Sequence, residues 1–203
     1  MAKARCVRFA VSRRLVFAVA FALGCGATPA ASPPPAPVVR AAPQLDAAAE
    51  RLVDLMRERL ALMPLVARAK WNARLPVEDA AREASLLAAL RERAGNRGLS
   101  PDWVETFFRA QIEAGKHVQR SLIDRWTAAA AAPFADTLDL RAEIRPRIDA
   151  VNDGLLDALA AVAPRIAAPG VQAAFRPARL QSAEVDAAAA ARALEPLRRR
   201  TPH

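Results

Sequence analysis

Apolar residues recur every three or four positions over most of the chain after residue 44, and this is the period of an α-helix rather than a strand. The clearest stripe, between residues 100 and 129, consists of Val104, Phe107, Phe108, Ile112, Val118, Leu122, Ile123 and Trp126. Strong helix formers dominate the composition, whereas tyrosine is absent and only seven glycines occur. The sequence therefore predicts an all-α fold.

Prolines and capping residues divide this periodic region into four long helices. We expect them near residues 44–71, 77–94, 100–129 and 140–163. Pro64 should kink or break the first helix, and Ser100 followed by Pro101 is a strong start signal for the third. One or two shorter helices should follow, the better of them at residues 183–194. Together they predict one domain, residues 44–203, built as a bundle of long helices with a helical C-terminal cap.

The first 31 residues have the order of charged and apolar residues that is typical of an export signal. Five basic residues and no acidic one precede the apolar run LVFAVAFALG, which is too short to span a bilayer comfortably. Residues 22–25, ALGC, resemble a bacterial lipoprotein cleavage site, whereas residues 27–31 offer ordinary cleavage sites. We predict a signal peptide at 1–31, a Pro/Ala-rich linker at 32–43 and an exported, periplasmic or secreted protein, cleaved in the ordinary way or lipid-anchored at Cys25.

Removal of this leader changes the charge and the cysteine content. The formal net charge falls from +9 to about +4, which removes the main argument for nucleic-acid binding. Both cysteines, Cys6 and Cys25, lie in the leader or at its end, so we expect no disulfide in the mature domain. Its stability should come from helix packing.

Polar side chains interrupt the apolar faces at four positions, which are Arg59, Lys70, Gln119 and Arg145. A buried cation without a partner costs too much free energy to persist in a core by chance. Asp79 and Glu83 are the best-placed carboxylates, and they are too few to neutralise the cations. The interior therefore keeps positive charge, which suits a dicarboxylate or a phosphate.

The same region lacks the residues of covalent and metal chemistry. It has no cysteine nucleophile, no histidine pair, no glycine-rich phosphate loop and no serine elbow. An enzyme built on these helices should act by binding and electrostatics, without a cofactor and without a metal.

The order and spacing of these residues resemble the all-helical type II chorismate mutases, and most closely their secreted subclass. The resemblance covers residues 44–159. It rests on the spacing of Arg59 and Lys70, the pair Lys70-Trp71, the run LPVEDAARE, the segment FFRAQIEAGKHVQ, and Arg145 before IDAVN. Chorismate mutases convert chorismate to prephenate by an intramolecular [3,3] rearrangement without a cofactor. They fold the substrate into its reactive conformation and stabilise the charge that develops on its ether oxygen.

The resemblance also implies a role for each matching residue. Lys70 and Gln119 would donate hydrogen bonds to the ether oxygen. Three arginines would bind the carboxylates, and two acids would meet the substrate hydroxyl or orient the cations. These five residues are Arg59, Arg82 and Arg145, and Asp79 and Glu83.

Two positions depart from the family pattern. Some relatives have a glutamate where this chain has Gln119, and a glutamate must be protonated to donate a hydrogen bond. Activity should therefore change little between mildly acidic and neutral pH. Gly115 stands where relatives commonly have a serine or threonine that helps bind a carboxylate, so that contact is either missing or replaced by a neighbour such as Lys116 or by water.

Some alternatives stay open at this point. If the break at Pro64 turned Arg59 outward, Arg57 or Arg68 would take its place. The secreted subclass can complete its pocket within one chain, with Arg145 replacing a partner's arginine; a homodimer is compatible with this and is not required by it. Two rival functions are isochorismate-pyruvate lyase on the same scaffold and a non-catalytic exported helical protein that binds small anions or a partner helix.

Overall fold

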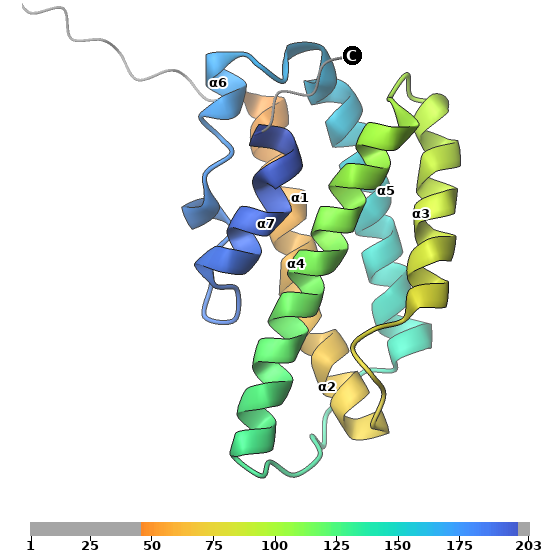
Figure 1. Cartoon of the computed structure of the whole chain (residues 1–203), viewed down its shortest axis with the longest axis vertical. Helices are drawn as coiled ribbons and strands as arrows, with labels where there is room; N and C mark the ends of the chain where they lie inside the picture. Colours follow the sequence, from red (N-terminus) through yellow and green to blue (C-terminus); the bar gives the residue numbers. More distant parts are fainter. Residues whose placement is uncertain (1–45, 199–203) are drawn as a thin grey trace, which may run out of the picture. The chain divides into compact units, whose positions relative to one another are not determined.

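The computed structural model describes residues 46–198, which belong to one compact unit and contain helices but no strand (Figure 1). The all-α prediction is confirmed. The main helices are α1 (Ala47–Ala61), α2 (Met63–Ala73), α3 (Ala80–Gly95), α4 (Pro101–Ala128), α5 (Arg145–Val162), α6 (Pro169–Gln172) and α7 (Ala187–Arg198). Within this range no helix is long and apolar enough to cross a membrane. The predicted signal peptide and linker, and the fate of Cys25, lie outside the described residues.

Two helix boundaries fall where the sequence signals place them. The first segment breaks between α1 and α2, and Pro64 lies in the first turn of α2, because proline has no N–H to continue the hydrogen bonding of α1. At the start of α4, the Ser100 side chain accepts a hydrogen bond from the Trp103 N–H at 3.4 Å, and Pro101 occupies the first turn.

Several helix boundaries differ from the prediction, and an aspartate caps two of the helices concerned. The helix expected from residue 77 begins at Ala80, because Asp79 accepts a hydrogen bond from the Arg82 N–H at 3.2 Å. Asp186 caps α7 in the same way, so this helix starts later than residue 183 and continues to Arg198. The helix expected at 140–163 begins as a five-residue π-helix, η1 (Leu140–Ile144), before α5.

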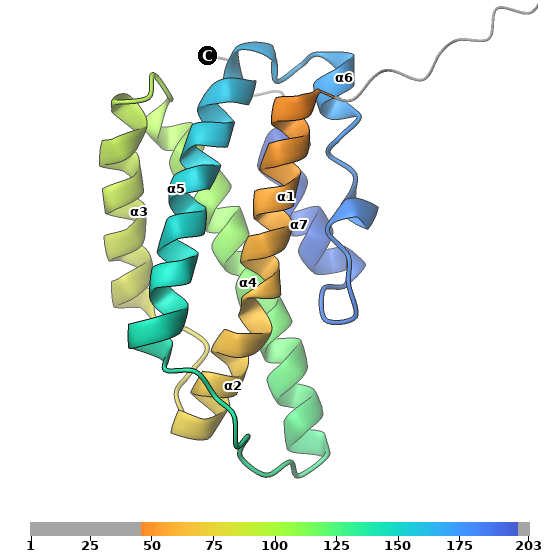
Figure 2. The same ribbon diagram turned by 180° about the vertical axis from the view of Figure 1, so that it is seen from behind.

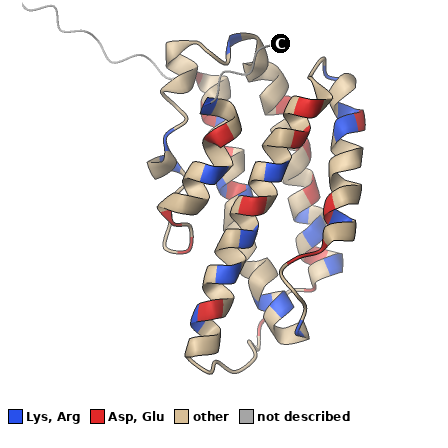
Figure 3. Ribbon diagram, viewed as in Figure 1, with Lys and Arg blue, Asp and Glu red and all other residues tan. Residues whose placement is uncertain are grey.

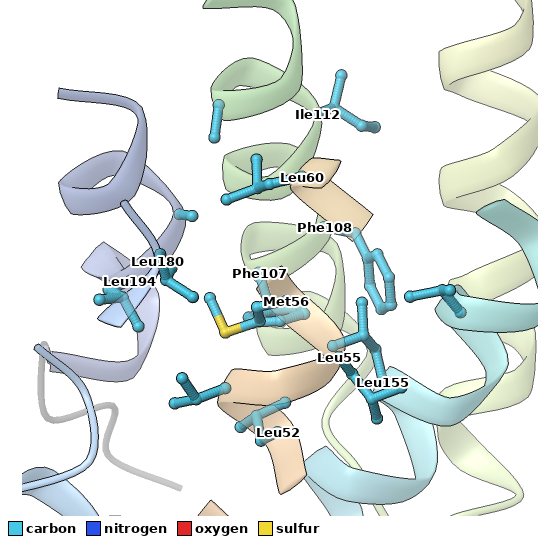
Figure 4. Close-up of a cluster of buried hydrophobic side chains, with 14 of the residues drawn as sticks. Leu52, Leu55, Met56, Leu60, Phe107, Phe108, Ile112, Leu155, Leu180 and Leu194 are labelled. Atoms are coloured by element: carbon cyan, nitrogen blue, oxygen red, sulfur yellow. The ribbon is translucent and has the colours of Figure 1, made fainter. Parts of the chain in front are cut away.

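The core lies along one side of α4, where the rings of Phe107 and Phe108 are fully buried with their centroids 5.1 Å apart. Figure 4 shows leucines and a methionine of α1 packed around them, with further side chains from α5 and the C-terminal segment. Seen from both sides, α7 lies along one flank of α4 and α3 along the other (Figures 1 and 2). The C-terminal segment thus completes the core, as a helical cap should.

Helix α3 is attached to the bundle differently from the other long helices. It buries only Leu87, Leu90 and Ala94, and it packs against α4. Ion pairs connect α3 and the turn after it to α5, and these are Arg82–Asp149, Arg93–Asp153 and Arg97–Asp157. Because residues 80–86 of α3 contribute no buried side chain, they leave space between α2, α4 and α5, and the candidate site occupies that space.

Candidate active site

One pocket is lined by every residue that the sequence analysis assigned to the site, and these are Arg59, Lys70, Asp79, Arg82, Glu83, Gln119 and Arg145. They come from both sides of the α1–α2 break, from the start of α3, from the second half of α4 and from the first residue of α5. Val66, Leu86, Ile112 and Ile148 supply apolar wall. Figure 3 shows basic residues gathered where α2 meets the lower ends of α3 and α5.

The two deepest cations are Arg59 and Lys70, whose exposed fractions are 4% and 7%. Burial lowers the pKa of Arg59 to about 10. Burial also lowers the pKa of Lys70, although the nearby Asp79 carboxylate opposes this shift. One N–H of the Lys70 ammonium donates to the carbonyl oxygen of Val77, so its other two N–H groups are available to a ligand.

Arg59 points inward despite the break at Pro64. Its Nε donates to Asn152 Oδ1 at 3.1 Å and its Nη1 donates to the Gln111 carbonyl oxygen at 2.8 Å. Neither alternative arginine lines the pocket: Arg57 is exposed and paired with Asp54, and Arg68 lies over the Phe134 ring at 4.9 Å from its centroid. The break at Pro64 therefore leaves Arg59 in the position that the sequence pattern predicts.

The outer cations of the pocket are held by carboxylates. Arg145 Nη2 lies 3.0 Å from Asp79 Oδ2, while the other Asp79 oxygen caps α3. Arg82 Nη2 lies 3.2 Å from Asp149 Oδ1. Arg145 is less buried than its place on an apolar stripe predicts, with 22% of its side chain exposed. These ion pairs fix the direction of both arginines before any ligand arrives.

Lys116 also lines the pocket, where its ammonium lies 3.1 Å from Glu83 Oε2. Desolvation lowers its pKa, but hydrogen bonds from its ammonium to Glu113 and Glu83 outweigh that effect, so its pKa is raised overall. With Lys116 included, five cationic side chains and two carboxylates line the pocket. The lining therefore carries a net positive charge, which can attract and hold a dianion.

Gln119 is buried, and its amide direction is set by its neighbours. Nε2 lies 3.3 Å from the Gly115 carbonyl oxygen and 3.6 Å from Met63 Sδ. Oε1 has no hydrogen-bond partner in the described part of the chain. Because the backbone carbonyl accepts only from a donor, the NH₂ group must lie on that side. This leaves a neutral donor in the pocket whose protonation does not depend on pH.

Met63 fills the space beside Gly115. A Cβ atom on residue 115 would come within 2.7 Å of Met63 Sδ. The space left by the missing serine or threonine therefore holds a thioether, which the sequence pattern does not predict. The pattern also indicates no role for Gln111 or Asn152, both buried beside Arg59, although Gln111 stands on the apolar stripe of α4.

Comparison with known proteins identifies the family of the chain. The family model described as Chorismate mutase type II matches residues 43–120. A secreted chorismate mutase of Mycolicibacterium smegmatis is 32% identical over 148 residues, which cover 73% of this chain and 78% of the relative. The chain belongs to the type II chorismate mutase family. The secreted chorismate mutase of Mycobacterium tuberculosis is 37% identical over 105 residues, and the match spans about half of the length of that relative (52%).

Solved structures of chorismate mutases share the fold. The enzyme from Burkholderia thailandensis superimposes with a TM-score of 0.66 and 34% identity, covering 75% of this chain and 99% of that one. The enzyme from Burkholderia phymatum gives a TM-score of 0.65 with 30% identity, covering 74% and 95% of the two chains. The chorismate mutase fold therefore extends over nearly all of the described residues, including the C-terminal part that the family model does not reach.

The contact between Met63 and Gly115 yields a first prediction. In Gly115→Ser the new side chain displaces the Met63 thioether, which then crowds Arg59 and Gln119. We expect kcat/KM for chorismate to fall by about ten- to a hundredfold. Adding Met63→Ala should recover most of the loss, because it empties the contested space.

Gly95→Ser is the matched control, since a Cβ there meets nothing within 4 Å, and its kinetics should equal those of the wild type. A Gly115→Ser enzyme that retains full kcat/KM would contradict this prediction.

Proposed function

We propose that this chain is an exported chorismate mutase that converts chorismate to prephenate by an intramolecular [3,3] rearrangement. The observation that carries the proposal is the pocket itself, where two buried cations without a carboxylate partner among residues 46–198 and one buried amide donor converge. The described lining contains no cysteine, serine or histidine. Such a pocket suits a reaction that needs binding and charge stabilisation and no nucleophile.

Substrate binding is assigned to the three arginines of the pocket. Arg59, through its Nη2 group, and Arg145 hold the two carboxylates of chorismate, and Arg82 completes the carboxylate-binding set. The Asp79–Arg145 ion pair, at 3.0 Å, holds Arg145 in place before the substrate arrives. Binding the carboxylates at fixed positions folds the substrate so that its reacting carbons approach each other, which converts binding energy into a lower barrier.

Charge stabilisation is assigned to Lys70 and Gln119. As the ether bond of chorismate breaks, negative charge develops on its oxygen. Two N–H groups of Lys70 are not used by Val77, and Gln119 can exchange its weak contact with the Met63 sulfur for the ether oxygen. Both donors are buried, so their interaction with the developing charge is stronger than it would be in water. Asp79 and Glu83 orient Arg145 and Lys116, or meet the substrate hydroxyl.

Export follows from the leader and is supported by the relatives, two of which are named secreted chorismate mutases. Cleavage within residues 1–31, a lipid anchor at Cys25 and a homodimer stay predictions. The pocket supports a site complete within one chain, because Arg145 comes from the same chain as the other lining residues.

The decisive test is chorismate turnover with product identification. The full chain is expressed with its own leader, purified from the extracytoplasmic fraction and mixed with chorismate, and the products are separated by chromatography. We expect prephenate, and we expect Lys70→Ala to lower kcat by about 10²- to 10³-fold or more, because it removes a donor to the ether oxygen.

Arg125→Ala is the matched control, because it removes an exposed cation of α4 that does not line the pocket. Circular dichroism establishes that both variants are folded. Turnover of isochorismate to pyruvate in place of chorismate would select the lyase, and turnover of neither substrate would overturn the proposed enzyme.

The pH profile tests the roles of Gln119 and Lys70. Since a glutamine donates at any pH, kcat should stay nearly constant between mildly acidic and neutral pH. In Gln119→Glu the donor exists only below the pKa of the new carboxyl group, so kcat should fall about tenfold per pH unit above that pKa.

On the alkaline side the Lys70 ammonium deprotonates as the pH rises. Because burial lowers its pKa, kcat/KM, which reports the free enzyme, should decline below the usual pKa of lysine. The decline in kcat should come at higher pH, since the bound carboxylates favour the ammonium form. A wild-type kcat that falls steeply between pH 5 and 7 would contradict the assignment of Gln119 as a donor whose protonation does not change.

Dilution tests whether the pocket is complete within one chain. If every arginine of the site comes from one chain, activity per mole of protein should be constant from micromolar to nanomolar concentration, whether or not the protein dimerises. A loss of specific activity that follows dissociation in sedimentation velocity would show that a partner contributes to the site.

A further inference from the structure

Two buried amide side chains are not explained by the pocket. Gln111 and Asn152 are 0% and 1% exposed, and neither lines the pocket. Each also has one buried polar atom without a hydrogen-bond partner in the described residues, namely Gln111 Oε1 and Asn152 Nδ2. A hydrocarbon side chain of similar size would avoid that penalty. Their presence in the core therefore calls for a reason other than packing.

Both residues contact Arg59, from two different helices. Asn152 of α5 accepts a hydrogen bond from Nε at 3.1 Å, and the backbone carbonyl of Gln111 in α4 accepts one from Nη1 at 2.8 Å. Since Nε can only donate, Asn152 must present its oxygen to Arg59, and this leaves its NH₂ group unpaired. Two bonds to different nitrogens of a planar group fix the direction of its plane. Nη2 makes no hydrogen bond to any residue in the range 46–198, and it is the part of the guanidinium left for a ligand.

Gly115 makes the bond to the Gln111 carbonyl accessible. On an α-helix a side chain covers the turn that precedes it, so a side chain at residue 115 would cover the carbonyl of residue 111. A Cβ at residue 115 would lie in van der Waals contact with Arg59 Nη1, at 3.7 Å. A longer side chain would compete for the space that the guanidinium uses to reach the backbone of α4.

The side chain of Gln111 extends away from Arg59 to the C-terminal helix. Its Nε2 donates to the Ala193 carbonyl oxygen of α7 at 2.8 Å. Helix α7 buries Ala189, Ala190, Ala193 and Leu194. The residue whose carbonyl holds Arg59 is thus itself attached to the segment that completes the core.

We propose that Asn152 and Gln111 are positioning residues that clamp Arg59 in its carboxylate-binding direction, and that α7 serves the site by anchoring Gln111. The inference rests on the proposed function of the pocket and gives the C-terminal segment a role in it. Asn152 does not touch the substrate. It acts by keeping the long arginine side chain from adopting other rotamers, so that less conformational entropy is lost when a carboxylate binds.

Asn152→Leu tests the part of the clamp that a side chain provides, which is the hydrogen bond from Arg59 Nε to Asn152 Oδ1. The leucine keeps the approximate volume and removes the acceptor for Nε. We expect KM for chorismate to rise about tenfold while kcat changes less, because the lost interaction serves the carboxylate in both the ground state and the transition state. On an Arg59→Ala background the same substitution should change kcat/KM by less than about twofold, because the group it positions is gone. Asn152→Ser, which is too short to reach Nε, repeats the test if leucine is not tolerated.

Nuclear magnetic resonance provides a readout that does not depend on activity. The Nε–H of Arg59 should give a signal protected from solvent exchange, assigned by its loss in Arg59→Lys. In Asn152→Leu its exchange should accelerate about tenfold or more. Val162→Ala, a buried substitution at the far end of α5, is the control; it should lower stability without changing KM or this signal.

The contribution of α7 is tested with two glutamines that both donate to it. Gln111→Leu removes the bond to Ala193, and Gln172→Leu removes a bond to the Leu197 carbonyl oxygen at 2.9 Å that has no contact with Arg59. Both should lower the melting temperature. Only Gln111→Leu should raise KM, by about threefold or more, and accelerate exchange of the Arg59 Nε–H.

The possible failures are distinguishable. A wild-type protein that does not turn over chorismate overturns the proposed function, and the exchange measurement then still decides the clamp. The clamp is overturned if Asn152→Leu leaves KM and exchange unchanged, or if its effect on kcat/KM is as large on the Arg59→Ala background as on the wild type. Equal effects of Gln111→Leu and Gln172→Leu on KM would overturn the role of α7.

Discussion

Burial of two like charges, Arg59 and Lys70, is the constraint on which the rest of the site depends. Each loses most of its hydration on folding, and neither forms an ion pair with a carboxylate in the described part of the chain. Desolvation of this kind destabilises the folded state by roughly several kcal/mol per ion. Hydrogen bonds to uncharged oxygens compensate part of it, from Val77 for Lys70 and from Asn152 and Gln111 for Arg59. Acceptors of this kind hold a cation without neutralising it.

Some residues that define the helix ends also orient side chains of the pocket. Asp79 caps α3 with one oxygen and holds Arg145 with the other, so the start of a helix and the direction of a site residue depend on one carboxylate. The π-helix η1 directly precedes α5, whose first two residues are Arg145 and Pro146. The π-helix η1 lies beside the pocket, which Leu140 lines, and there the direction of a side chain matters more than the regularity of the helix.

Much of this could be predicted from the sequence, because apolar periodicity and proline signals are strong in a helical protein. The four long segments, the break at Pro64 and the start at Ser100 are visible as patterns, and so are the polar residues that interrupt the stripes. The seven predicted site residues do line one pocket. What the pattern lacks is pairwise geometry. In the sequence, Gln111 and Asn152 look like ordinary polar residues, and only the structure shows that both contact Arg59. The contact of Met63 with Gly115 depends on how closely α2 approaches α4, and the spacing of residues in the sequence does not specify that distance. The sequence does not reveal the π-helix, because its backbone hydrogen bonds join residues five apart, whereas those of an α-helix join residues four apart. Over only five residues, the two spacings give the same apolar pattern.

The distribution of ion pairs also indicates where the binding free energy for a dicarboxylate arises. Arg145 and Lys116 already have carboxylate partners from the pocket wall, and Arg82 has Asp149, so a substrate carboxylate there largely replaces one partner with another. At Arg59 and Lys70 nothing anionic is displaced, and the substrate meets charges that the fold has dehydrated in advance. The net electrostatic gain is therefore concentrated at these two residues. In the proposed mechanism the partly exposed ion pairs orient the substrate and Arg59 holds one of its carboxylates. Lys70 then provides the stabilisation that grows as charge develops on the ether oxygen.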